Sequence, residues 1–343
     1  MSARASIIPV FVPHLGCPHA CVFCNQRRIS GQERPASAET VREAIRGAEG
    51  LLREQKRELA FYGGSFTAIP EQRQTELLAA AKEALDAGQI DAIRLSTRPD
   101  AIDDNVLARL RWYGVETVEL GAQSMDDEVL RRSGRGHTAA DVLRASAQVK
   151  AAGFRLVLQM MTGLPGDSPG RCVESARRII RCRPDGVRIY PTVIVKDTEL
   201  YEMWRRGEYR EHTVEDAVNI CARIVPLFER AGIPVIRLGL NPTEELSGGA
   251  AVAGAYHPAL GELVRSRILY HEAARLLKGV RPGSRVILEV HLSQVSQMTG
   301  QHRENLLALR DAFALKDLRV KPGACALGEI RVLTLEGGET KHT

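Results

Sequence analysis

The chain has 343 residues, 44% of them hydrophobic, which is enough for one large core or for a barrel with a smaller appended domain. No segment approaches the about 20 uninterrupted apolar residues that a membrane span requires. The first residues also lack the basic and apolar regions of a secretory signal. We therefore expect a cytoplasmic protein with no membrane partner.

The charge and the cysteines of the sequence indicate which kinds of partner and of metal or disulfide site to expect. The formal net charge is +5, from 47 Lys and Arg against 42 Asp and Glu, and residues 261–343 hold 13 of the former and 9 of the latter. Such an excess is typical of a solvated surface or of a patch that meets RNA phosphates. Three of the seven cysteines fall within eight residues, which indicates one metal site in a reducing compartment and not a disulfide framework.

Short β-branched apolar runs alternate with amphipathic stretches through residues 1–240, which predicts βα units and a parallel sheet in an α/β fold. The predicted strands are Ile7–Val12, Glu58–Tyr62, Ala92–Ser96, Val115–Leu120, Arg155–Met160 and Gly186–Tyr190, with Pro234–Leu238 as a candidate seventh. The predicted helices between them include Glu39–Gln55, Gln72–Ala87, Ala139–Ala152 and Glu215–Ala231. Six units are fewer than the eight of a complete barrel, so we expect a partial (βα)6 barrel with an open side.

The pattern changes after Pro242, where we expect a small α+β extension over residues 241–343. Its Gly- and Ala-rich stretch 247–258 reads as a loop. The elements predicted after it are helices Gly261–Lys278 and Arg303–Ala312 and strands Val286–Val290, Leu318–Lys321 and Glu329–Thr334. Because most of the excess positive charge lies here, we expect the extension to recognise substrate.

Three cysteines follow the first predicted strand: Cys17, Cys21 and Cys24, with three and then two residues between them. A loop of this size can direct three thiolates at one cuboidal [4Fe–4S] cluster, and three ligands leave one iron open to chelate S-adenosylmethionine (SAM). The reduced cluster would then cleave SAM and release a 5′-deoxyadenosyl radical. The alternative is a closed zinc site that adds His19, although structural zinc sites usually join two separate ligand pairs.

The second predicted strand ends in Gly63, Gly64 and Ser65. Glycines permit close approach of a ligand to the backbone, and the protonated amino group of SAM is a suitable one. Without the cysteines upstream, the same pair of glycines would indicate only a tight turn.

Seven motifs together resemble the radical SAM half of the Elongator catalytic subunit, in the same order, over residues Ile7–Leu240. They are CPHACVFC (17–24), GGSFT (63–67), STRPD (96–100), ELGAQS (119–124), RGHT (135–138), GLPGD (163–167) and IYPTVIVKDTELYEMWRRGEY (189–209). The resemblance implies SAM contacts at the strand ends, namely Ser96, Arg98, Glu119, Gln123, Arg135 and Gln159, with Phe23 against the adenine. Gln and Glu can hold ribose hydroxyls and Arg135 can pair with the SAM carboxylate, while the alternative for each is an ordinary polar contact at the barrel mouth.

One departure from the family concerns the acetyltransferase domain that follows the radical half of the Elongator subunit. Residues 241–343 carry no pyrophosphate-cradling signature of the kind an acetyl-CoA site needs. We therefore expect this chain to lack that domain, and the reaction type stays open.

Candidate substrate contacts are Tyr190, Lys196, Arg237 and His257. Their alternatives are a solvated lysine and residues that fasten the extension to the barrel. We expect hydrogen abstraction from a tRNA nucleoside, with an electron donor such as flavodoxin or ferredoxin. A lyase or isomerase acting on a free small molecule, such as a modified purine-like base, is one alternative; a non-catalytic metal-containing RNA-binding module is another.

Overall fold

The computed structural model describes residues 6–12, 21–25, 36–48, 56–240, 246–336 and 339–342. The chain forms two compact units, Met1–Ala217 with Leu227–Pro258 and Val218–Pro226 with Ala259–Thr343. Within the described ranges, every helix is too short or too polar to cross a membrane. The functional division that we predict at residue 240 stays a prediction.

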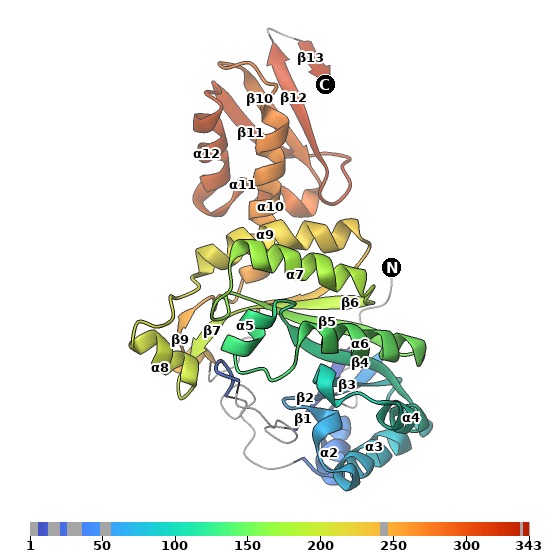
Figure 1. Ribbon diagram of the computed structural model, residues 1–343. Helices are drawn as coiled ribbons and strands as arrows, with labels where there is room; N and C mark the ends of the chain where they lie inside the picture. The colour runs from blue at the N-terminus through green and yellow to red at the C-terminus, as the bar shows by residue number, and fades with distance from the viewer. Residues whose placement is uncertain are drawn as a thin grey trace. The chain divides into compact units, whose positions relative to one another are not determined.

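Seven parallel strands form the main sheet of the first unit, in the order β1, β2, β3, β4, β5, β6, β8 (Figure 1). They are β1 Ser6–Phe11, β2 Arg57–Tyr62, β3 Ala92–Thr97, β4 Val115–Gln123, β5 Arg155–Thr162, β6 Gly186–Pro191 and β8 Val235–Leu238. The order in the sheet follows the order in the chain, as successive βα units produce. The predicted partial barrel is confirmed, and the candidate seventh strand belongs to it.

Helices connect these strands. They are α2 Ala38–Ala48, α3 Glu71–Asp86, α4 Asp104–Trp112, α5 Asp127–Arg132, α6 Ala139–Ala151, α7 Pro169–Arg181, α8 Glu199–Arg205 and α9 Val214–Arg230, with short 3-10 turns η1 Phe66–Ala68 and η2 Pro99–Ala101. Thr138 and Thr213 form capping boxes at the starts of α6 and α9, which satisfy backbone N–H groups left unpaired by the helix. The predicted end of the first helix at Gln55 lies outside the described residues.

A two-stranded antiparallel sheet pairs β7 Val193–Val195 with β9 Ala251–Gly254, after a π-helical turn at Leu246–Ala250. We expected a loop over 247–258, so the prediction was wrong for β9. Gly254 has φ 92°, and a Cβ there would lie 2.9 Å from the carbonyl oxygen of Thr192. Only glycine allows this approach. The Gly- and Ala-rich composition that indicated a loop therefore permits two strands to pair closely.

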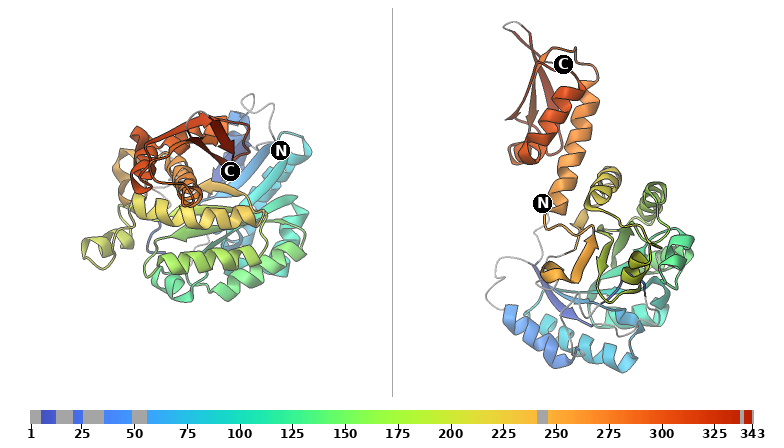
Figure 2. Two further views of the ribbon diagram at one scale, coloured as in Figure 1. Left: turned by 90° about the horizontal axis from the view of Figure 1, so that it is seen from above. Right: turned by 90° about the vertical axis from the view of Figure 1, so that its left-hand side faces the viewer.

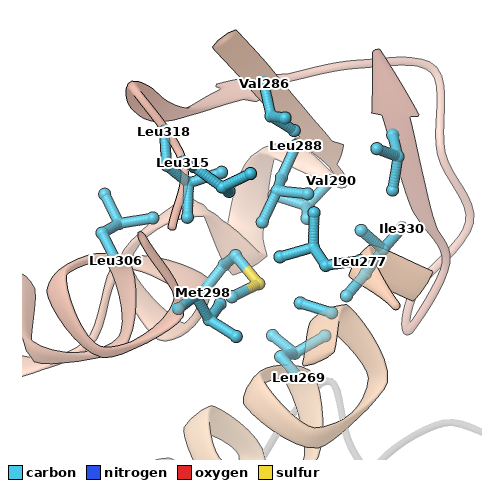
Figure 3. Packing of buried hydrophobic residues seen from close by; sticks show 13 residues of the cluster. Leu269, Leu277, Val286, Leu288, Val290, Met298, Leu306, Leu315, Leu318 and Ile330 are labelled. Atoms are coloured by element: carbon cyan, nitrogen blue, oxygen red, sulfur yellow. The ribbon is translucent and has the colours of Figure 1, made fainter. Parts of the chain in front are cut away.

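The second unit has a four-stranded sheet in the order β11, β10, β12, β13. Its elements are α10 Leu260–Leu277, β10 Arg285–Val290, η4 Leu292–Gln294, α11 Val295–Thr299, η5 Gln301–Arg303, α12 Glu304–Ala312, β11 Asp317–Pro322, β12 Ile330–Glu336 and β13 Glu339–His342. Helices α10 and α12 lie on one face of this sheet (Figure 2, right). Alternate residues of β10 point into the apolar core beneath them, where Val286, Leu288 and Val290 belong to the same cluster as Met298 (Figure 3). The predicted α+β extension is confirmed.

Candidate cofactor site at the strand ends

The cysteine loop is described from Cys21 to Asn25, while Cys17 and His19 lie outside the described residues. The Cys24 N–H donates to the Cys21 carbonyl oxygen at 3.0 Å, so these two cysteines stand at the ends of one four-residue turn. Among the described residues, no three His, Cys, Asp or Glu side chains form a metal site. The predicted three-cysteine ligand set therefore stays a prediction.

Two backbone hydrogen bonds hold this loop in place. The Val22 N–H donates to the Ser133 carbonyl oxygen at 3.1 Å, and the Leu200 N–H donates to the Val22 carbonyl oxygen at 2.7 Å. Phe23 packs on a buried cluster that includes Ile194 and Leu200. Its observed partners are thus the β7 strand and helix α8, and the adenine contact stays a prediction.

Arg135 links the cysteine loop to the end of β4. Its Nη1 donates to Cys21 Sγ at 3.3 Å and its Nη2 donates to the Gly121 carbonyl oxygen at 2.7 Å. Arg98 Nη2 donates to the Arg135 carbonyl oxygen at 2.7 Å and also pairs with Asp100 at 2.8 Å. Both predicted arginines are buried, and these hydrogen bonds hold them in place.

Gln123 occupies an irregular position at the end of β4, where the register against β5 shifts. Its φ is 62°, a left-handed conformation that is rare for a residue other than glycine and often kept at functional sites. Its Oε1 is buried and has no hydrogen-bond partner in the described part of the chain. A Cβ at Gly121 would lie 3.1 Å from Gln123 Nε2 and 3.2 Å from Arg135 Nη2, so this glycine leaves room for both side chains.

Glu119 lies at the centre of a buried polar network inside the barrel, with an exposed fraction of 0%. Its Oε1 accepts from Arg94 Nη1 at 2.7 Å and from Tyr62 OH at 3.2 Å. Arg188 pairs with both carboxylate oxygens, at 3.1 Å from Nη2 and 3.0 Å from Nε, and also donates to Tyr62 OH at 2.8 Å. Arg94 reaches Glu58 as well, at 2.6 Å.

Two further predicted residues join this network. Gln159 Nε2 donates to Glu119 Oε2 at 3.0 Å, and Ser96 lies 3.4 Å from the same oxygen. The structure thus brings together Ser96, Glu119 and Gln159 from three adjacent strands. Because Glu119 Oε1 already accepts from Arg94 and Arg188 and Oε2 already accepts from Gln159, a ribose contact by Glu119 stays a prediction that requires an exchange of partners.

Burial and charge set the protonation of this region. Burial, and then the Glu119 carboxylate, raise the pKa of Tyr62 well above its usual range, so its phenol stays neutral. Burial would lower the pKa of Arg188, but Glu119 and the two tyrosines Tyr62 and Tyr190 raise it overall. Near the cysteine loop, burial and the charge of Arg135 lower the pKa of His137 to about 4, so this imidazole is neutral.

The Gly-Gly loop after β2 is tied to the end of β3. Gly63 has φ 94°, which favours glycine. Ser65 is buried, lies 3.1 Å from Thr97 Oγ1 through its Oγ, and accepts from the Arg98 N–H at 3.2 Å. Contacts of Gly63, Gly64 and Ser65 with SAM stay predictions.

The four candidate substrate residues fall in different places. Tyr190 is half-buried on β6, and Arg237 stands beside Arg188 in the β6–β8 register and donates to the carbonyl oxygens of Gly239 and Leu240, both at 2.9 Å. Lys196 is exposed just after β7, and His257 is half-buried after β9. Tyr190 and Arg237 thus adjoin the Glu119 network.

Sequence reasoning missed Glu58, Tyr62, Arg94 and Arg188 as members of the network. A signal for them exists: each charged member stands within a short strand that is mostly buried, where an unpaired charge would be costly. Arg94 and Ser96, like Arg188 and Tyr190, are also two residues apart and so face the same side of their strand.

Two models of known protein families match this chain. A family model for the Radical SAM superfamily matches residues 11–179, and one for the Radical SAM C-terminal domain matches residues 184–269. Together they cover well over half of the chain.

Individual relatives agree with these matches. Elongator complex protein 3 of Saccharomyces cerevisiae is 29% identical over 273 residues, 66% of this chain and 49% of that protein. The tRNA uridine(34) acetyltransferase of Methanocaldococcus jannaschii is 29% identical over 232 residues, 61% of this chain and 41% of that protein. The chain therefore matches about half or less of the length of these two relatives.

A solved structure shares the fold. Methanocaldococcus infernus Elp3 with an N-terminal deletion has a TM-score of 0.61 and 22% sequence identity, over 84% of this chain and 71% of that one.

Proposed function

Because the chain belongs to the radical SAM superfamily and is an enzyme that uses a [4Fe–4S] cluster and SAM, we propose that it modifies a nucleoside of tRNA. The observation that carries the substrate class is the similarity across the barrel to proteins named Elongator complex protein 3 and tRNA uridine(34) acetyltransferase. The acetyl-CoA-dependent half of such a reaction is not part of the proposal.

The residues present fit these cofactors. Cys21 and Cys24 stand at the ends of one turn, and Cys17 precedes them at a spacing suited to a cluster with one open iron. Gln123 Oε1 and Arg135 Nε are buried polar atoms with no hydrogen-bond partner among the described residues, as expected where a polar cofactor binds. When bound, the reduced cluster supplies the electron for SAM cleavage and hence the carbon radical that takes hydrogen from substrate.

We assign the chain's own side chains two tasks in this reaction. Gln123 and Arg135 hold SAM at the end of β4, with the backbone of Gly63 and Gly64 facing its amino group. The Glu119 network holds β2, β3, β4 and β6 at fixed spacing, because its hydrogen bonds and ion pairs join side chains from all four strands. Tyr190 and Arg237 lie where a substrate entering the open side of the barrel would meet them.

Nucleoside analysis tests the substrate class. We expect tRNA from cells lacking the gene to lose one modified nucleoside, or to accumulate its precursor, relative to wild-type cells. Cells carrying Cys21→Ala should match the deletion, and cells carrying Cys182→Ala should match the wild type, because Cys182 lies outside the cysteine motif, at the end of α7, where its Sγ donates to the Arg178 carbonyl oxygen. Identical nucleosides in all strains would contradict the proposal and favour a free small-molecule substrate.

We further propose that the extension, residues 241–343, binds the RNA. Arg310 and Arg319 form ion pairs only with neighbouring carboxylates in the described structure, at 2.9 Å to Asp311 and 2.7 Å to Asp317, and pairs of this exposed kind contribute little stability. Both remain accessible to phosphates, as does the exposed Arg303.

Charge reversal tests this role. We expect Arg303→Glu, Arg310→Glu and Arg319→Glu to weaken tRNA binding and to flatten its dependence on log salt concentration by about 0.9 per lost phosphate contact. Arg144→Glu is the matched control, because its side chain on α6 of the first unit is 54% exposed, and it should change neither the binding nor its salt dependence. Binding that ignores salt, or an equal effect of the control, would show that the charge of the extension is only a solvated face.

A further inference from the structure

Arg135 is a buried cation whose charge is not balanced by a carboxylate. Its exposed fraction is 7%, and among the described residues it forms no ion pair with Asp or Glu. The arginines of the Glu119 network, in contrast, are each paired with a carboxylate. Since an uncompensated buried charge is costly, the site requires an anion beside Arg135.

The nearest anionic candidate is a thiolate. Arg135 Nη1 lies 3.3 Å from Cys21 Sγ, within hydrogen-bonding distance for sulfur. A guanidinium stays protonated at any pH that a protein experiences, so it can only donate in this contact. Metal binding requires Cys21 as the thiolate, which gives the guanidinium the anion it lacks.

The geometry around Arg135 is fixed from several directions. Its Nη2 donates to the Gly121 carbonyl oxygen at 2.7 Å, its N–H donates to the Leu130 carbonyl oxygen at 3.0 Å, and its carbonyl oxygen accepts from Arg98 at 2.7 Å. The next loop residue, Val22, is bonded to Ser133, two residues before Arg135. The same short segment therefore holds both the backbone and the sulfur of the cysteine loop.

We infer that Arg135 donates a hydrogen bond to the Cys21 sulfur of the bound cluster and so raises the reduction potential of the cluster. Reduction adds one negative charge, and a fixed cation beside a ligand sulfur stabilises the reduced form more than the oxidised form. This is a positioning and tuning role, distinct from the contact with SAM. It rests on the cluster part of the proposed function and is independent of the tRNA part.

The test is a potentiometric titration of anaerobically reconstituted protein, without SAM and without RNA. We expect Arg135→Gln to lower the equilibrium constant for reduction about tenfold. For a one-electron couple this corresponds to a reduction potential about 59 mV lower than that of the wild type. Arg135→Lys keeps the charge but not the two-armed contact with Gly121 and Cys21, so we expect a smaller decrease. Arg131→Ala is the matched control. It also removes one positive charge, four residues earlier in the chain, but from a side chain that is 72% exposed. The reduction potential of the cluster in this variant should equal that of the wild type.

The outcomes separate the alternatives. A role of Arg135 only in SAM binding predicts a wild-type potential for Arg135→Gln with full iron content, and that result overturns the inference. An equal shift in Arg131→Ala also overturns it, since the effect would then be one of overall charge. If Arg135→Gln does not retain a full cluster, Arg135→Lys decides: a lowered potential supports the inference and an unchanged one overturns it. Failure of the tRNA proposal would leave these potentials unaffected.

Discussion

Replacing Cys21 with alanine is expected to abolish cluster assembly and SAM cleavage. Two remaining thiolates cannot hold a cuboidal cluster with one open iron. The mutation also removes the sulfur that accepts from Arg135. Iron counting after anaerobic reconstitution and assay of 5′-deoxyadenosine measure the loss, which should be complete within the sensitivity of the assay.

Cysteines outside the motif provide the controls. Cys182→Ala and Cys325→Ala should retain iron and SAM cleavage, because their sulfurs contact backbone carbonyl oxygens at 3.6 Å, those of Arg178 and Glu289. A Cys21→Ala protein that forms 5′-deoxyadenosine at the normal rate would refute the assignment of Cys21 as a cluster ligand.

The second large effect is expected from Glu119→Gln. The neutral amide leaves Arg188 buried with no carboxylate partner in the described structure, while Arg94 keeps Glu58. Removing one partner of a buried ion pair lowers the free energy of unfolding by about 3–5 kcal/mol, because the other charge stays buried without compensation. Chemical denaturation of the protein without cofactors should show the corresponding fall in the free energy of unfolding.

Glu116→Gln on the same strand is the matched control. Glu116 pairs with Lys56 at 2.7 Å, but about a third of its side chain is exposed (35%). Exposed pairs contribute about 0–1 kcal/mol, so this variant should change the stability little. Equal effects of the two substitutions would show that the buried network does not stabilise the fold as we argue.

The order of strands and helices could be predicted because it depends on local periodicity. Apolar runs such as Arg155–Thr162 are buried strands of a parallel sheet, and polar residues at their ends mark the side of the barrel on which ligands bind. The pairing of β7 with β9 could not be predicted, because paired residues such as Val195 and Ala251 are 56 or more positions apart in the sequence and their pairing depends on the folded chain. The strand register likewise determines which side chains meet, and one residue of slip would turn each to the opposite face.

The sequence by itself determined the family motifs, the cysteine spacing and the residues Ser96, Glu119 and Gln159, because each depends on residue type and on nearby spacing. Only the tertiary structure decided how their charges are balanced. Glu119 meets arginines 25 and 69 residues away, and Arg135 meets Cys21 across 114 residues. A buried charge is stabilised by whichever groups the fold brings within a few ångströms, and that choice is a property of strand register and loop packing, not of local sequence.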